Sequence, residues 1–148
     1  MILRWLIATL HILVLPLGLG AIWMRASALT RAAHAGLARV FLADNLWGAA
    51  ALLWIVTGLW RAFGGLEKGT AYYLRDHAFH VKMGLFALIL VLELWPMATL
   101  IRWRIGVRRG STVDLRVAPL LARVSYVEAA LVILMVFAAT AVARGYFY

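Results

Sequence analysis

The stretch FHVKMGLFALILVLELWPMATLI, residues 79–101, decides the class of this protein, because nearly all of it is apolar. A helix that crosses a lipid bilayer needs about 20 apolar residues. Inside lipid, backbone N–H and C=O groups must bond within the protein, which leaves helices and closed barrels. The stretch does not alternate polar and apolar residues with the period of a strand. We therefore expect it to form a membrane-spanning helix.

Three further runs are comparably long and apolar: 2–23, 41–63 and 122–143. The chain of 148 residues is 66% hydrophobic and 14% charged, whereas soluble domains are about 45–50% apolar and about 25% charged. A water-soluble fold of this size cannot bury so much apolar surface. The first run is longer than the apolar core of a signal peptide, and no convincing A-x-A cleavage site follows it, so we expect a retained helix. The sequence predicts one all-α domain, an integral membrane four-helix bundle.

Positive charges are distributed unequally between the two ends of this predicted bundle. Loops 24–40 and 102–121, with Arg123 close behind, hold nine arginines, and the other end holds five arginines and lysines. The positive-inside rule then predicts both termini outside and the two arginine-rich loops in the cytoplasm. The net charge of +9 could indicate nucleic acid, but the arginines flank membrane spans. Lipid, with anionic headgroups at these loops, is the expected partner, and nucleic acid is not.

Three acidic residues, Asp44, Glu93 and Glu128, fall at a similar depth in the inner half of the predicted spans. An ionisable residue in the middle of a membrane costs about 2.5–3.5 kcal/mol, so each is a functional hypothesis. We expect them to form a polar layer near Arg25 and Arg102. Two interpretations stay open. The layer can hold the helices together by ion pairs and hydrogen bonds, or it can belong to a path for protons.

In the outer half, His11 is the strongest candidate ligand, about 13 Å from the start of its helix at 1.5 Å per residue. Neutral imidazole is the usual protein ligand of haem iron. Lys82 lies on the inward face of the third helix, whereas His80 is expected at the interface or the edge of the pocket. Trp54 and Arg61 share one face of the second helix. The following loop would add Tyr72, Tyr73 and His77. We expect these groups to line one pocket.

One histidine with one basic residue suits a porphyrin with propionate groups better than a bare metal ion, which needs three or four clustered ligands. The chain has no cysteine, which excludes disulfides, thiolate metal sites and c-type haem attachment. Gly18, Gly48 and Gly58 would permit either close helix packing or space for a flat ligand.

The whole chain resembles an uncharacterised family of bacterial four-helix membrane proteins, domain of unknown function 2214. The stretches that carry this resemblance are NLWGAAALLWIVTGLWRAFGGLEKGTAYYL (45–74), HVKMGLFALILVLELWPMATLIRWRI (80–105) and VFAATAVARGY (136–146). The family name implies no activity.

A second and weaker resemblance is to HemJ-type protoporphyrinogen oxidases and, more loosely, to CopD-like membrane proteins. It rests on TLHIL around His11, TGLW at 57–60 and HVKMGL from His80. The resemblance implies haem b as cofactor, His11 as the axial ligand of the iron, and Lys82 as a cation near the porphyrin or the substrate carboxylates.

Three functions are therefore open. The chain can bind haem b or a related porphyrin in the outer half, with a redox role. It can be an accessory or scaffold subunit of a larger membrane complex without a cofactor of its own. It can be a small proton or metal permease, which would need a homodimer to form a pore wall. Whether the protein is an enzyme, and on which substrate, is not specified by the sequence.

Overall fold

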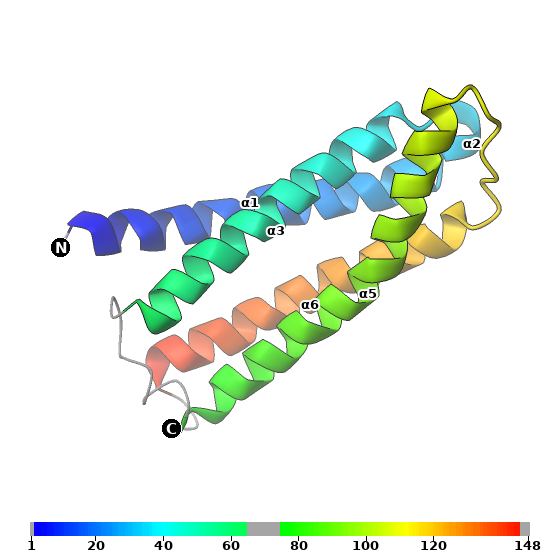
Figure 1. Cartoon of the computed structure of the whole chain (residues 1–148). Helices are drawn as coiled ribbons and strands as arrows, with labels where there is room; N and C mark the ends of the chain where they lie inside the picture. The colour runs from blue at the N-terminus through cyan, green and yellow to red at the C-terminus, as the bar shows by residue number, and fades with distance from the viewer. Residues whose placement is uncertain (1, 65–74, 146–148) are drawn as a thin grey trace.

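The computed structural model describes residues 2–64 and 75–145, and these residues are almost entirely helical. They form α1 (Ile2–Leu29), α2 (Ala32–Ala35), α3 (Ala38–Phe63), α5 (His77–Arg108) and α6 (Ala118–Arg144). All but α2 are long and apolar enough to cross a membrane. The predicted all-α class is confirmed, and the chain is a multi-pass integral membrane protein (Figure 1).

The long helices extend beyond the predicted runs, and nearly all of the additional turns lie at one end of the bundle. There α1 continues to Leu29 and α5 to Arg108, while α3 and α6 begin several residues early. Apolar runs mark only the part of a helix that lies in lipid. The backbone continues to bond within the helix where arginines begin. As a result Arg25, which the sequence placed in a loop, lies inside α1.

The two ends of the bundle differ in what they carry. α1 begins and α6 ends at one end, which we name the outer end (Figure 1). At the opposite end, the arginine-rich end, α2 joins α1 to α3, and residues 109–117 join α5 to α6 (Figure 1). α1 packs along α3 and α6, and α5 packs along α6, whereas close backbone contacts between α3 and α5 are few. Long side chains must therefore connect α3 to α5.

The buried apolar side chains form clusters between the helices. One cluster at the arginine-rich end contains Leu29, Val40, Leu100 and Leu121, one from each long helix. A second lies nearer the middle and contains Ile22, Trp47, Ile89 and Val132. Between these two clusters the helices are held at fixed positions, so polar side chains there are placed accurately.

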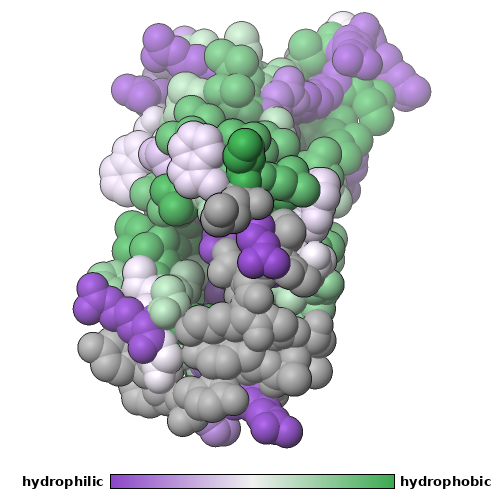
Figure 2. All heavy atoms as spheres, turned by 90° about the vertical axis from the view of Figure 1, so that its left-hand side faces the viewer, coloured by the Kyte–Doolittle hydropathy of each residue, from purple (hydrophilic) through white to green (hydrophobic). Residues whose placement is uncertain are grey.

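The side chains that face away from the core of the bundle are largely apolar, as expected for a protein surface in lipid. Leu17 and Phe137 are each 69% exposed, an amount that water would disfavour for side chains of this size. Figure 2, viewed toward the outer end, shows hydrophobic residues in the upper half of the visible face and hydrophilic patches toward its upper and lower edges. Exposed large apolar side chains occur on all four long helices, which agrees with a belt of lipid around them.

Two helix ends are fixed by local chemistry. α5 begins after Asp76, whose side chain accepts a hydrogen bond from the Phe79 backbone N–H at 3.1 Å, as an N-cap residue does. α6 ends at Gly145 with φ of 71°, a left-handed conformation that favours glycine. Asp76 places the first turn of α5, and with it His80 and Lys82.

Candidate functional site

A buried arginine connects all four long helices. Arg25 on α1 is 0% exposed, and its five N–H groups all have acceptors. Nε donates to Ser125 Oγ at 3.1 Å. Its acidic partners are Asp44 on α3 and Glu93 on α5, which pairs with both terminal nitrogens at 2.7 Å, together with Glu128 on α6. We call these residues, with Arg104, the charge cluster.

Two further side chains, Trp47 and Arg104, donate hydrogen bonds to the acidic residues on α3 and α5. Trp47 Nε1 donates to Glu93 Oε2 at 3.0 Å. Arg104 Nη2 donates to Asp44 Oδ2 at 2.6 Å, and its Nη1 donates to Asn45 Oδ1 at 2.7 Å. Arg104 thereby bridges α5 to α3 where their backbones are apart. Both oxygens of Asp44 and both oxygens of Glu93 accept at least one hydrogen bond.

Glu128 differs from the other two acids. Its Oε2 accepts from Arg25 Nη2 at 2.7 Å, and its side chain is 0% exposed. Its Oε1 is buried and has no hydrogen-bond partner within the described structure. A buried oxygen without a donor costs about 1–3 kcal/mol, and more when it is charged. Glu128 Oε1 is thus the carboxylate oxygen of the charge cluster that the surrounding side chains leave unsatisfied, and Arg104 Nε is the buried donor of the cluster without a partner within the described structure.

The structure brings together the three acids that the sequence placed at one depth, but one predicted neighbour is wrong. Arg102 is exposed and donates to the Ala98 carbonyl of its own helix at 3.3 Å. Arg104 occupies the expected position. The reason is helical phase. Arg104, eleven positions after Glu93, lies within roughly 20° of the same face of the helix, whereas Arg102, nine positions after Glu93, lies on the opposite face.

In the outer half, the His11 side chain lies against α3. His11 Nδ1 is 2.7 Å from Thr57 Oγ1, and the His11 carbonyl accepts a hydrogen bond from Trp54 Nε1 at 3.0 Å. A Cβ added at Gly58 would lie 3.4 Å from His11 Cε1, so the missing side chain lets the imidazole approach the α3 backbone. Three α3 residues in two turns therefore position this ring.

The hydrogen bonds of Thr57 determine the imidazole tautomer. Thr57 Oγ1 lies 2.6 Å from the Leu53 carbonyl, the short bond that threonine makes to residue i−4 in a helix. The hydroxyl has a single hydrogen, and this bond uses it. Thr57 Oγ1 therefore accepts from His11 Nδ1–H, so the ring lone pair is at Nε2. This tautomer is the one that a metal-binding imidazole with an Nδ1 hydrogen bond adopts.

The other predicted pocket residues are on α3 and α5. Arg61 is half-buried and lies four residues after Thr57, on the face of α3 that carries Trp54. Lys82 is half-buried on the α5 stripe that contains Ile89 and Glu93. His80 is exposed, and its Nδ1 is 2.9 Å from the Asp76 carbonyl oxygen. The convergence of His11 with Lys82 stays a prediction. Tyr72 and Tyr73 lie outside the described residues.

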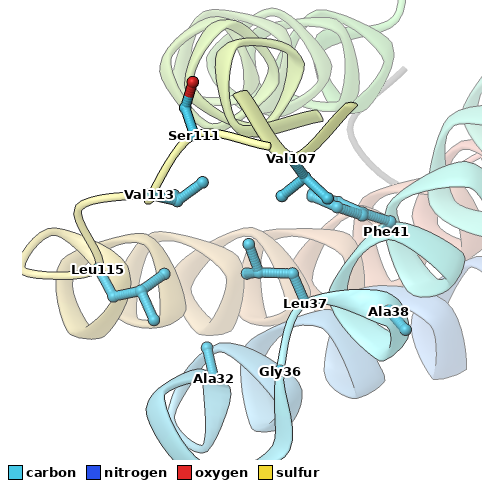
Figure 3. A pocket seen from close by; sticks show the side chains of 9 residues that line it. All are labelled: Ala32, Gly36, Leu37, Ala38, Phe41, Val107, Ser111, Val113 and Leu115. Carbon is cyan, nitrogen blue, oxygen red and sulfur yellow. The ribbon is translucent and has the colours of Figure 1, made fainter. Parts of the chain in front are cut away.

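The described surface includes two open hollows, one near each end of the bundle. The larger, about 450 Å³, is at the arginine-rich end between the start of α3 and the α5–α6 connection, where Leu37, Phe41, Val107 and Val113 line it (Figure 3). The second, about 380 Å³, lies along the last turns of α6 beside Phe137 and Arg144. Neither is lined by His11. Among the described residues, no group of three or more His, Asp or Glu side chains is arranged to hold a metal ion.

Sequence reasoning missed the residues that connect the candidate groups. Arg25 was expected near the three acids but was counted with the loop charges, so its burial within α1 and its bonds to all three acids were not predicted. Ser125 and Thr57 were not assigned roles, because a hydroxyl in an apolar helix has no pattern that predicts its partner. A threonine near the depth of His11 was the available signal.

The comparisons with known proteins agree with the membrane architecture. No curated protein and no solved structure matches this chain. The model of one protein family, described as predicted membrane protein (DUF2214), matches residues 3–146. That range includes all four spans and both candidate sites, and it confirms the family that the sequence resembled. The chain therefore belongs to the DUF2214 family of predicted membrane proteins.

Proposed function

We propose that this protein binds haem b or a related porphyrin in its outer half, with His11 as the axial ligand of the iron. The observation that carries the proposal is the Nδ1–H bond of His11 to Thr57, at 2.7 Å. Such a bond orients the ring of a metal-binding histidine and increases the basicity of the other nitrogen. The lone pair at Nε2 is then suited to iron.

The groups around His11 suit a porphyrin in three respects. The site offers one imidazole rather than a cluster of metal ligands, which fits an ion already held by four porphyrin nitrogens. Trp54 supplies an aromatic side chain, its ring centroid 6.4 Å from that of His11. Arg61, one turn nearer the outer end, would pair with a propionate under this proposal. When bound, haem would supply one-electron transfer. His11 would hold the iron, and Thr57 would hold His11.

Lys82 and His80 are on α5, which packs along α6 rather than α1. Under this proposal Lys82 acts as a second cation for carboxylates that extend toward α5, as the resemblance implied. His80 is exposed at the start of α5, so we expect it to be dispensable for the cofactor. The axial role therefore falls to His11 alone among the candidates.

The absorption spectrum of the purified protein tests this proposal. The full chain, produced with ample haem supply, should show a Soret band that changes on reduction. His11→Ala should lose it, while His80→Ala and His34→Ala should retain it because both histidines are exposed. Thr57→Val should retain haem with about 10–100-fold weaker affinity. A colourless wild type, or an unchanged spectrum in His11→Ala, would contradict the proposal.

A second candidate function is an accessory subunit of a larger membrane complex, without its own cofactor. The same contacts favour it: Trp54 and Thr57 use His11 to join α3 to α1 by two hydrogen bonds, as polar residues join helices in membranes. This function predicts a colourless protein that co-purifies with other membrane proteins, or as a homodimer, and a His11→Ala variant that still assembles.

The orientation proposed with either function places the arginine-rich end in the bacterial cytoplasm. The chain contains no cysteine, so single cysteines report accessibility without background. In intact spheroplasts, Arg144→Cys at the end of α6 should react with a membrane-impermeant maleimide. Ser111→Cys, exposed between α5 and α6, should react only after lysis. The opposite pattern would reverse the orientation.

A further inference from the structure

The charge cluster contains one more acidic group than basic groups. Three carboxyl groups meet there, from Asp44, Glu93 and Glu128, and two guanidinium groups, from Arg25 and Arg104. With every group ionised, the cluster would carry a net charge of −1. Burying an uncompensated charge is costly, because the protein interior and lipid cannot replace the solvation by water. The geometry therefore requires a neutralising cation.

The hydrogen bonds show where that cation belongs. Asp44 accepts from one arginine on each oxygen, and Glu93 accepts from Arg25 on each oxygen. Glu128 accepts on Oε2 alone, and its Oε1 is buried without a partner within the described structure. The excess negative charge is thus concentrated at an oxygen to which no donor is directed.

We propose that Glu128 is a proton-binding site, and that its Oε1 carries the proton at neutral pH. The groups that face it are Arg25 from α1, Asp44 from α3, and Glu93 and Arg104 from α5. Ser125 on α6 is the further polar group, and it donates to the Leu121 carbonyl while accepting from Arg25. A protonated Glu128 makes the cluster neutral without removing any of its hydrogen bonds.

The neighbours of Glu128 provide a way for the proton to exchange. Glu93 Oε2 and Glu128 Oε2 each lie 2.7 Å from the same atom, Arg25 Nη2, so the two carboxyl groups are adjacent. The Glu93 and Asp44 side chains are 19% and 18% exposed, whereas Glu128 is 0% exposed. Glu93 is thus the carboxyl group adjacent to Glu128 and the more exposed of the two, so we expect the proton of Glu128 to exchange through it.

Infrared spectroscopy of the full chain in lipid nanodiscs tests this site. At neutral pH the wild type should show the C=O stretch of a protonated carboxylic acid, which shifts in deuterated water. Glu128→Gln should remove the part of this band that belongs to one carboxyl group. Asp114→Asn, a change at an exposed loop carboxylate, should leave the band unchanged. If the band is equal in wild type and Glu128→Gln, Glu128 is ionised and the proposal is wrong.

Thermal unfolding provides a second and independent measurement. Glutamine has the shape of a protonated glutamate, so Glu128→Gln should unfold at the wild-type temperature. Glu93→Gln should unfold at a lower temperature because it weakens the two bonds to Arg25. A Glu128→Gln variant as unstable as Glu93→Gln would overturn the proposal. So would stabilisation of the wild type by Na⁺ or K⁺ over choline at equal ionic strength, because a metal cation would then neutralise Glu128.

These measurements do not depend on the cofactor. The charge cluster and His11 lie in different halves of the bundle and share no residue. A colourless protein can still show the Glu128 band, and a protein with a Soret band can lack it.

Discussion

The two halves of the bundle use polar side chains in different ways. In the arginine-rich half, the guanidinium group of Arg25 bonds to residues of α3, α5 and α6, and eight side-chain oxygen and nitrogen atoms take part in these bonds. In the outer half, the hydrogen bonds of His11 to Thr57 and Trp54 join α1 to α3. The first arrangement connects four helices, whereas the second connects two. Stability and ligand binding are therefore expected to respond to different substitutions.

The largest effect is expected from Arg25→Met, which removes the centre of the charge cluster. Breaking a buried ion pair by removal of one partner costs about 3–5 kcal/mol, because it leaves buried charge unpaired. Here three carboxylates lose their shared donor, so the variant should fail to accumulate or should unfold far below the wild type. Thermal unfolding in detergent, followed by circular dichroism, measures this.

Arg25→Lys is the matched control for that substitution. It restores a positive charge but offers three donors in place of five, so it should recover part of the stability and not all of it. If Arg25→Met were as stable as the wild type, the charge cluster would not hold the arginine-rich half together.

Much of this contrast was predictable from the sequence, and the rest depended on how the helices pair. Apolar runs predicted the four spans because lipid imposes their length. Asp44, Glu93 and Glu128 were placed at one depth because helical rise is constant. Arg25 was assigned to a loop because the end of an apolar run is a poor guide to the end of a helix. Thr57 as the partner of His11 required knowing that α1 packs on α3 in this register, and no single-helix pattern contains that information.

A pair of glycines tests how closely α1 and α3 must approach. A Cβ at Gly18 would lie 3.3 Å from Ala50 Cβ, whereas a Cβ at Gly48 would meet nothing within 4 Å. Gly18→Leu should therefore separate the helices and cost about 1–3 kcal/mol, and Gly48→Leu should be tolerated. The comparison is made by thermal unfolding of both variants. Equal stability of the two would mean that the α1–α3 contact at Gly18 is not tight.

The hydrogen bonds between His11 and α3 in the outer half should contribute less to stability than the charge cluster does. Thr57→Val keeps the shape of the side chain but removes the acceptor for His11 Nδ1–H, which costs about 1 kcal/mol. The effect on haem affinity should be greater than the effect on stability, because the imidazole loses its orientation as well as one bond. Haem titration and thermal unfolding of the same sample separate the two. A loss of stability as large as that of Arg25→Met would show that the bond between His11 and Thr57 also holds the bundle together.

The smallest effect is expected at the exposed ion pair between Asp114 and Arg116, in the connection from α5 to α6. The Arg116 guanidinium donates to the Asp114 carboxylate and lowers its pKa below the usual value. A carboxylate with a lowered pKa in the folded state stabilises the protein above its unfolded-state pKa, and this contribution is lost as the pH falls through the folded-state value. Both side chains are mostly exposed, so water and salt weaken the pair. Asp114→Asn should leave the unfolding temperature unchanged at neutral pH. An ion pair of the kind that connects four helices around Arg25 contributes little to stability where water can replace either partner. A measurable loss of stability in Asp114→Asn would contradict this dependence on burial.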